Sequence, residues 1–186
     1  MGVNDFVINV QDGAMGGARS QDYHIPTRME CSSCHNSSLG FIRGLRTGQM
    51  NKVVDGFNQI SAFADLQLFS NPEDIPVLDT DMPRYVAADD ITASNEDVVK
   101  SYLAVNCSHC HNPDPAAPCN AAGDDFRFGS FNVQTLTTAD PAAGRQQRIV
   151  PGNSAGSSVF DAMASQRMPQ IGTQIVDPVF LPRLMD

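Results

Sequence analysis

Asn106-Cys107-Ser108-His109-Cys110-His111 is the stretch from which the rest of this chain is best interpreted. A second stretch far upstream, Cys31-Ser32-Ser33-Cys34-His35, has the same C-x-x-C-H pattern. Four of the five cysteines fall in these two motifs, and in both a histidine follows the second cysteine directly. This repeated placement indicates a shared chemical role for the two motifs.

The C-x-x-C-H pattern is the attachment signature of a c-type haem. The two thiols add across the haem vinyl groups as thioethers, and the adjacent histidine supplies a neutral imidazole to one axial face of the iron. The sequence therefore predicts two covalent c-type haems as cofactors. The attachment residues would be Cys31, Cys34, Cys107 and Cys110, with His35 and His111 as iron ligands.

Other uses of the cysteines are less well matched to the pattern. Two C-x-x-C pairs offer four thiolates to one structural zinc. However, Cys31 and Cys107 lie 76 residues apart in the chain, and zinc does not require the histidine that follows each pair. A thioredoxin-like dithiol needs a βαβ context, which neither motif has, and simple disulfides leave both histidines unexplained. Two haems are therefore the favoured interpretation.

The sixth iron ligands are sought among the methionines, because electron-transfer cytochromes usually use Met or a second His. Met168 lies 57 residues after His111. Pro169 and Gly172 would hold this segment extended and let it pass close to a flat ring. Met168 is therefore the predicted sixth ligand of the second haem.

For the first haem the prediction is Met82, which also precedes a proline and lies 47 residues after His35. His24, Met29, Met50 and an open position remain as alternatives. A bis-His site would have a lower potential, and an open site would permit peroxide or small-ligand chemistry. His109 is expected to be a spacer that points away from the iron.

Helical spacing dominates the pattern of apolar residues. Ser94 is followed by acidic residues and by an apolar stripe that runs into Cys107, which predicts a capped helix before the second motif. A further helix is expected from about Ser154 to Ser157 onward, and two short helices between Gln49 and Phe69. One strand-like run, residues 6–10, is expected to be an edge strand or an arm.

Composition limits the partners. The net charge is −9 and the pI is about 4.7, which argues against nucleic acid or an anionic membrane surface as a partner and leaves a basic redox protein as an option. No apolar run approaches the roughly 20 residues of a membrane span, and no signal peptide is visible. Because c-type haems are attached outside the cytoplasm, the chain is expected in the periplasm or outside the cell, with its export signal removed.

Several phrases resemble a bacterial family of di-haem c-type cytochrome proteins, in which the haem region is often the C-terminal part of a larger secreted protein. They are residues 25–35, 39–41 and 49–51 in the first half, and residues 102–113, 151–154, 168–173 and 176–177 in the second. The resemblance implies a mainly α fold of two tandem cytochrome c-like helical haem domains with long irregular loops. The expected division is an arm at residues 1–22, a first haem domain at 23–92 and a second at 93–186.

The expected function is electron transfer between redox partner proteins outside the cytoplasm, with no catalytic residues. One alternative is a peroxidase-like di-haem enzyme with an open first haem. Another is a haem-bearing subunit of a larger assembly, in which the N-terminal strand and Cys119 would contact other subunits. A buried, inert thiol is the simpler expectation for Cys119.

Overall fold

The structure is a computed structural model of the 186-residue chain. It describes residues 5–12, 17–37, 44–71, 73, 75, 81–115, 117–119, 124–130, 136–139, 147–171 and 175–185. Residues 39–41, which carry part of the resemblance, and Gly172 lie outside the described residues. Among the described residues, no helix has both the length and the apolar character that crossing a bilayer requires.

The C-terminal half is built around α4 (Asn95–Asn106), the longest helix. Its N-cap is Ser94, whose hydroxyl oxygen accepts a hydrogen bond from the backbone N–H of Asp97 at 3.1 Å, as the sequence predicts. The helix ends at Asn106, and Cys107 is its C-cap. The second motif therefore starts where α4 stops, and this part of the sequence-based prediction is confirmed.

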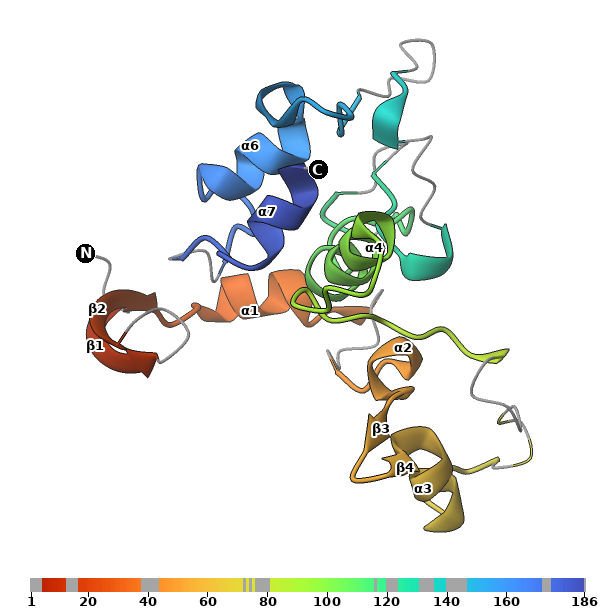
Figure 1. Ribbon diagram of the computed structural model, residues 1–186. Coiled ribbons are helices and arrows are strands. Elements are labelled where there is room, and N and C mark those ends of the chain that lie inside the picture. Colours follow the sequence, from red (N-terminus) through yellow and green to blue (C-terminus); the bar gives the residue numbers. More distant parts are fainter. Residues whose placement is uncertain are drawn as a thin grey trace.

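Of two shorter helices, α7 (Phe180–Met185) packs against α4, and α6 (Ser158–Ala164) packs against α7 (Figure 1). Short 3-10 turns η4 (Phe128–Ser130) and η6 (Ser154–Gly156) lie in the loops of this half. The buried cluster that joins these elements consists of Val98, Val99, Leu103, Phe126, Leu136, Met163, Phe180 and Leu184. Full burial of each large side chain contributes roughly 1.5–3 kcal/mol, so this cluster is the main source of stability among the described residues.

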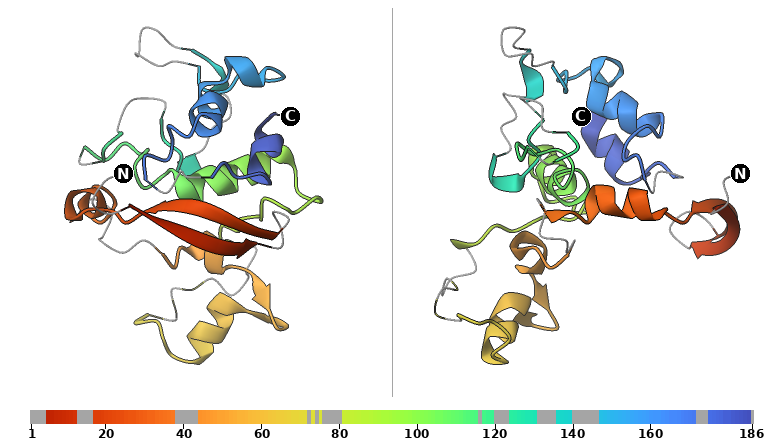
Figure 2. Two further views of the ribbon diagram at one scale, coloured as in Figure 1. Left: turned by 90° about the vertical axis from the view of Figure 1, so that its left-hand side faces the viewer. Right: turned by 180° about the vertical axis from the view of Figure 1, so that it is seen from behind.

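The N-terminal half contains more strand than expected. The strands β1 (Asp5–Asp12) and β2 (Gly17–His24) form an antiparallel hairpin that projects from the rest of the chain (Figure 2). Helix α1 (Arg28–Cys34) follows and carries the first motif. Thr27 caps it with a capping box, in which Glu30 hydrogen-bonds back to the cap.

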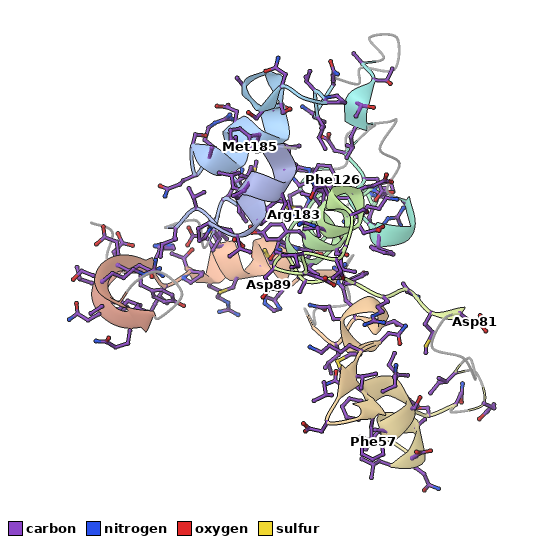
Figure 3. The ribbon with its side chains drawn as sticks, in the orientation of Figure 1. Phe57, Asp81, Asp89, Phe126, Arg183 and Met185 are labelled. Atoms are coloured by element: carbon purple, nitrogen blue, oxygen red, sulfur yellow. The ribbon has the colours of Figure 1, made fainter. Side chains whose placement is uncertain are left out.

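A third group of elements comprises α2 (Thr47–Met50), β3 (Val53–Val54), β4 (Phe57–Asn58) and α3 (Gln59–Asp65). Between β3 and β4, Asp55 and Gly56 have φ values of 52° and 86°. Positive φ at both central residues is what a two-residue hairpin turn requires. Figure 3 places Phe57 on this group, far from Phe126 and Arg183, which lie where α4 and α7 meet.

The expectation of a mainly α fold made of two tandem cytochrome c-like helical domains is wrong. Of the described residues, 38% are helical and 15% lie in strands, with six short helices and two small sheets. Residues 5–12 and 17–24 form the paired antiparallel strands β1 and β2, and part of the expected helical segment after Gln49 forms β3 and β4. The expected boundary at residue 92 stays a prediction, although Val86 and Ala88 before it pack against the core of the C-terminal half.

Candidate functional site

The second motif folds as a tight turn directly after α4. The backbone N–H groups of Cys107 and Ser108 donate to the carbonyl oxygen of Leu103 at 2.9 and 3.0 Å. The N–H of His111 then donates to the carbonyl oxygen of Cys107 at 2.8 Å. These bonds fix the backbone of the motif relative to the helix, so that both cysteines and His111 face one region.

That region is a cavity of about 310 Å³. Its wall includes all four residues that the sequence predicts for the second haem, namely Cys107, Cys110, His111 and Met168. Met168 reaches the cavity from the loop after α6, because its own N–H and that of Arg167 donate to the carbonyl oxygen of Ala162. The structure therefore brings together residues that lie up to 61 positions apart in the chain.

The surroundings of His111 are apolar on one side and charged on the other. Its ring lies 4.8 Å from that of Phe126, centroid to centroid, and its Nδ1 is buried without a hydrogen-bond partner among the described residues. Burial lowers the pKa of His111; the nearby Asp124 raises it and Arg148 lowers it further. Asp124 and Arg148 form a two-pronged ion pair with N–O distances of 2.7 and 2.8 Å. The neutral imidazole is the favoured form.

None of the five cysteines, all of which the structure describes, forms a disulfide bond. Burial, reinforced by the neighbouring Cys110, raises the pKa of Cys107 to about 12. Burial also raises the pKa of Cys119, followed by the effect of Asp124. Cys119 lines the same cavity, because its N–H donates to the carbonyl oxygen of Cys110 at 3.1 Å. No motif or periodicity in the sequence indicates that this fifth thiol belongs beside the second motif.

Arg46 connects the N-terminal half to the second motif. One guanidinium nitrogen, Nη1, donates to the carbonyl oxygen of Ala104 at 3.1 Å and to the hydroxyl oxygen of Ser108 at 2.7 Å. Ser108 is buried and its hydroxyl donates to the same Ala104 carbonyl at 2.6 Å. The spacer residue Ser108 is thus part of a three-way contact, which a local sequence pattern cannot reveal.

The first motif is more open to solvent. Cys31 and His35 are exposed, whereas Cys34 is half-buried and lines the cavity of the second motif. The last residue of α1 is Cys34, and it lines the same cavity as the turn that follows α4. The ligand atoms of Cys34, His109 and Cys110 all lie within 4.8 Å of one another. His109, expected to be only a spacer, therefore faces the first motif.

His24 and Met29 are alternative candidates for the sixth ligand of the first haem, and their surroundings differ from each other. His24 hydrogen-bonds Asp5 through Nδ1 at 2.7 Å and Glu30 through Nε2 at 3.0 Å. These bonds, Asp5 before Glu30, raise the pKa of His24. The Met29 side chain is 82% exposed.

Met82 lines a separate, largely apolar cavity of about 290 Å³, together with Met50, Ile60, Phe63 and Phe69. Neither His35 nor a cysteine of the first motif is among the described residues that line it. Asn51 holds this segment, because its Nδ2 donates to the carbonyl oxygens of Met82 and Pro83 at 3.2 and 3.3 Å. The structure therefore does not bring Met82 to His35, and its role as a ligand stays a prediction.

Of the residues predicted from the sequence, those of the second motif converge with Met168, and Cys34 joins them from the first motif. Those that sequence reasoning missed are Arg46, Cys119 and Glu30, which also lines the cavity. Only the spacing from one motif to Met168 gave a usable signal, because the other contacts depend on tertiary packing. Comparisons with protein-family models, curated proteins and solved structures find no significant match for this chain.

Proposed function

We propose that this chain is a di-haem c-type cytochrome unit that transfers electrons outside the cytoplasm. The observation that carries the proposal is the shared cavity of Cys107, Cys110, His111 and Met168. Two thiols, an imidazole and a thioether are the donor set of a covalently attached haem with His/Met ligation. Nothing in the local sequence requires Met168 to face the second motif, so its position supports the proposal independently of the motif itself.

The residues present fit a haem at the second motif. The volume of the cavity lies in the range of a cofactor site. The cavity is also partly open to solvent, which a planar group larger than the enclosed volume requires. The buried Nδ1 of His111 is without a partner among the described residues, so the orientation of this ring is not fixed by a protein hydrogen bond there. When bound, a c-type haem supplies a one-electron iron couple whose potential the axial ligands set.

Each protein group has a distinct task at this site. The sulfurs of Cys107 and Cys110 would hold the haem through thioether links, and His111 and Met168 would supply the imidazole and thioether ligands to its iron. Phe126 packs against the His111 ring and keeps its surroundings apolar. Desolvation of the cavity wall and a thioether ligand both raise the reduction potential of a haem iron. The second haem is therefore the high-potential member of the pair.

The first haem is assigned to Cys31 and Cys34 on α1 and to His35, the C-cap residue of this helix. The exposure of Cys31 and His35 leaves this attachment site open to solvent. The sulfur atoms of Cys34 and Cys110 lie within 4.8 Å of each other, which supports electron exchange within one chain if both motifs carry a haem. With its net charge of −9, the chain would favour a positively charged redox partner.

The proposal is tested by covalent haem content in protein exported through a haem-attachment pathway. The unchanged chain is expected to carry two haems in a mass spectrum, and Cys107→Ser combined with Cys110→Ser is expected to carry one. Cys119→Ser serves as the matched control, because Cys119 lines the same cavity outside the motif and should leave both haems in place. Loss of haem in the control, or no haem in the unchanged chain, contradicts the proposal.

A second candidate function is peroxide reduction at the first haem. It is favoured by the surroundings of the candidate sixth ligands: Met82 and Met50 share another cavity, and both ring nitrogens of His24 are hydrogen-bonded to carboxylates. An open iron position would then remain. A ferric spectrum with a high-spin component that cyanide converts to low-spin supports this candidate, and two low-spin haems that do not respond to cyanide exclude it.

A further inference from the structure

We propose that the chain, before haem attachment, binds one Zn²⁺ ion through Cys34, His109 and Cys110. The ligand atoms of these residues lie within 4.8 Å of one another, and they come from both motifs. This site goes beyond the proposed function, because it needs His109, a residue that haem attachment does not use. It also differs from a four-thiolate zinc site, which would use Cys31 and Cys107 and no histidine.

The donor set matches the metal. Zn²⁺ is borderline-soft and binds thiolates and imidazoles in a tetrahedral arrangement, and two cysteines with one histidine are a known three-ligand set with water in the fourth position. Ligand atoms on a tetrahedral zinc lie roughly 3.5–4 Å apart, as follows from Zn–S bonds of about 2.3 Å. Closing from the separation found here needs side-chain movements on the order of 1 Å, and binding releases the two thiol protons to solvent.

The location gives the ion an entry path and a structural effect. Cys34 and Cys110 both line the cavity of the second motif, and all three residues are half-buried, so the ligands can be reached from solvent. Cys34 is the last residue of α1, whereas His109 and Cys110 lie in the turn after α4. A bound ion would therefore tie α1 to the end of α4 and hold the two motifs together before the haems are attached.

The ion and the haems compete for the same sulfurs. Thioether formation at Cys34 and Cys110 removes both thiolates, so the zinc site belongs only to the haem-free chain. Zinc loading should in turn protect these two thiols from alkylation. Cys31 and Cys119 lie outside the cluster and should still react.

The test uses the full-length haem-free chain, purified under reducing conditions and titrated with Zn²⁺, with Co²⁺ as a spectroscopic probe. One ion per chain is expected, and Co²⁺ should show thiolate charge-transfer and tetrahedral d–d bands. His109→Asn and Cys34→Ser should each lower Zn²⁺ affinity by about tenfold or more, since even the loss of a residue that only supports a ligand costs 10–100-fold. Iodoacetamide mapping should show protection of Cys34 and Cys110.

Matched variants make the result decisive. Cys31→Ser and His35→Asn change the first motif outside the cluster and should leave Zn²⁺ affinity within about twofold of the unchanged chain. Any of four results overturns the inference. These are an unaltered Zn²⁺ affinity in His109→Asn, equal losses of Zn²⁺ affinity in Cys31→Ser and Cys34→Ser, a Cys34–Cys110 disulfide in place of the metal, and no Zn²⁺ binding. The proposed haem function is judged separately, because His109→Asn should still receive two haems when the chain is exported.

Discussion

A single guanidinium group at Arg46 holds the start of the second motif. It donates to the Ala104 carbonyl and to the Ser108 hydroxyl, both at the end of α4. Hydrogen bonds to a charged group contribute roughly 1.5–3 kcal/mol. Both contacts of Arg46 come from one nitrogen, Nη1, so they are counted together, and one acceptor, Ser108, is buried. Arg46 therefore positions the motif without being part of the chemistry.

Arg46→Ala is expected to lower the free energy of unfolding by about 2–3 kcal/mol, because it removes both contacts. Arg46→Lys should restore part of the loss, since an ammonium group can reach only one of the two acceptors well. Urea unfolding followed by circular dichroism measures the change. Arg127→Ala is the matched control: its ion pair with Asp125 lies on an exposed surface and should contribute less than about 1 kcal/mol. Equal losses in the two variants contradict the assigned role.

At the scale of one side chain, the proposed ligation of the second haem iron depends on Met168. Met168→Ala is expected to keep both covalent haems, to remove the contribution of the second haem to the near-infrared charge-transfer band of Met-ligated ferric haem, and to lower the potential of one haem. Met29→Ala is the control, because this side chain is 82% exposed and away from the cavity. A band of unchanged intensity in Met168→Ala contradicts ligation by Met168.

At the scale of elements, the β1–β2 hairpin is fastened to α1 by one histidine between two carboxylates. The hydrogen bonds of His24 to Asp5 and then to Glu30 raise the pKa of His24 above its ordinary value of 6.5. The backbone N–H of Thr27, and next His24, lower the pKa of Glu30 to about 2 from 4.5. The contact is therefore strongest when His24 is protonated and Glu30 is ionised.

This arrangement stabilises the contact between the hairpin and α1 only within a limited pH range. The contribution of His24 is fully present below pH 6.5 and is lost as the pH rises through its raised pKa, whereas that of Glu30 is present above about pH 4.5 and is lost on acidification toward pH 2. An NMR titration of the His24 ring, assigned through His24→Asn, should give a pKa above 6.5 that falls in Glu30→Gln. A midpoint at or below 6.5, or no change in Glu30→Gln, contradicts the predicted contact.

Some elements follow from local sequence and others do not. Helix α4 was predicted because its cap and its apolar stripe are both local signals. The hairpin β3–β4 was mistaken for helix because Val53, Val54 and Phe57 fit a helical spacing, although the Asp55-Gly56 turn signal stood between them. Strand β2 was missed because Ser20, Gln21 and Asp22 show no strand pattern, and pairing with β1 overrides their weak propensity.

The residues of the candidate site also divide into those that could be predicted from local sequence and those that could not. The sequence alone predicts one group of site residues, namely Cys107, Cys110, His111 and Met168. Covalent haem attachment requires the C-x-x-C-H motif, and the position of Met168 after His111 in the chain limits the choice of methionine. The approach of Cys34 to His109, and that of Arg46 to Ser108, depends on how α1 and α2 pack against the end of α4. Contacts between distant segments leave no periodic signal in one sequence, so the cross-motif cluster was not foreseen.

At the scale of the whole molecule, stability is concentrated in the C-terminal half. Tyr102 on α4 stacks on Phe180 of α7 with ring centroids 3.5 Å apart and planes 3° from parallel. Phe180 is fully buried, whereas Phe57 on the group of α2, β3, β4 and α3 is 71% exposed. The second motif thus extends from the best-packed part of the described chain, and the first motif from a less buried helix.

Phe180→Ala is expected to lower the free energy of unfolding by about 3–5 kcal/mol, because it leaves a cavity between α4 and α7 and removes the ring stack. Phe57→Ala should change it by less than about 0.5 kcal/mol, since that ring is exposed. Thermal and urea unfolding of both variants provide the comparison. A Phe57→Ala variant as unstable as Phe180→Ala refutes the view that the C-terminal half dominates stability.

The central claim is that both C-x-x-C-H motifs carry covalent haem, and a pyridine haemochrome assay of the exported, unchanged chain tests it most directly. The assay counts haem per chain after acid–acetone extraction has removed any haem that is not covalently bound. Two haems per chain are expected, attached at Cys31, Cys34, Cys107 and Cys110. A count of one or zero in protein that has passed through a working haem-attachment pathway contradicts this assignment.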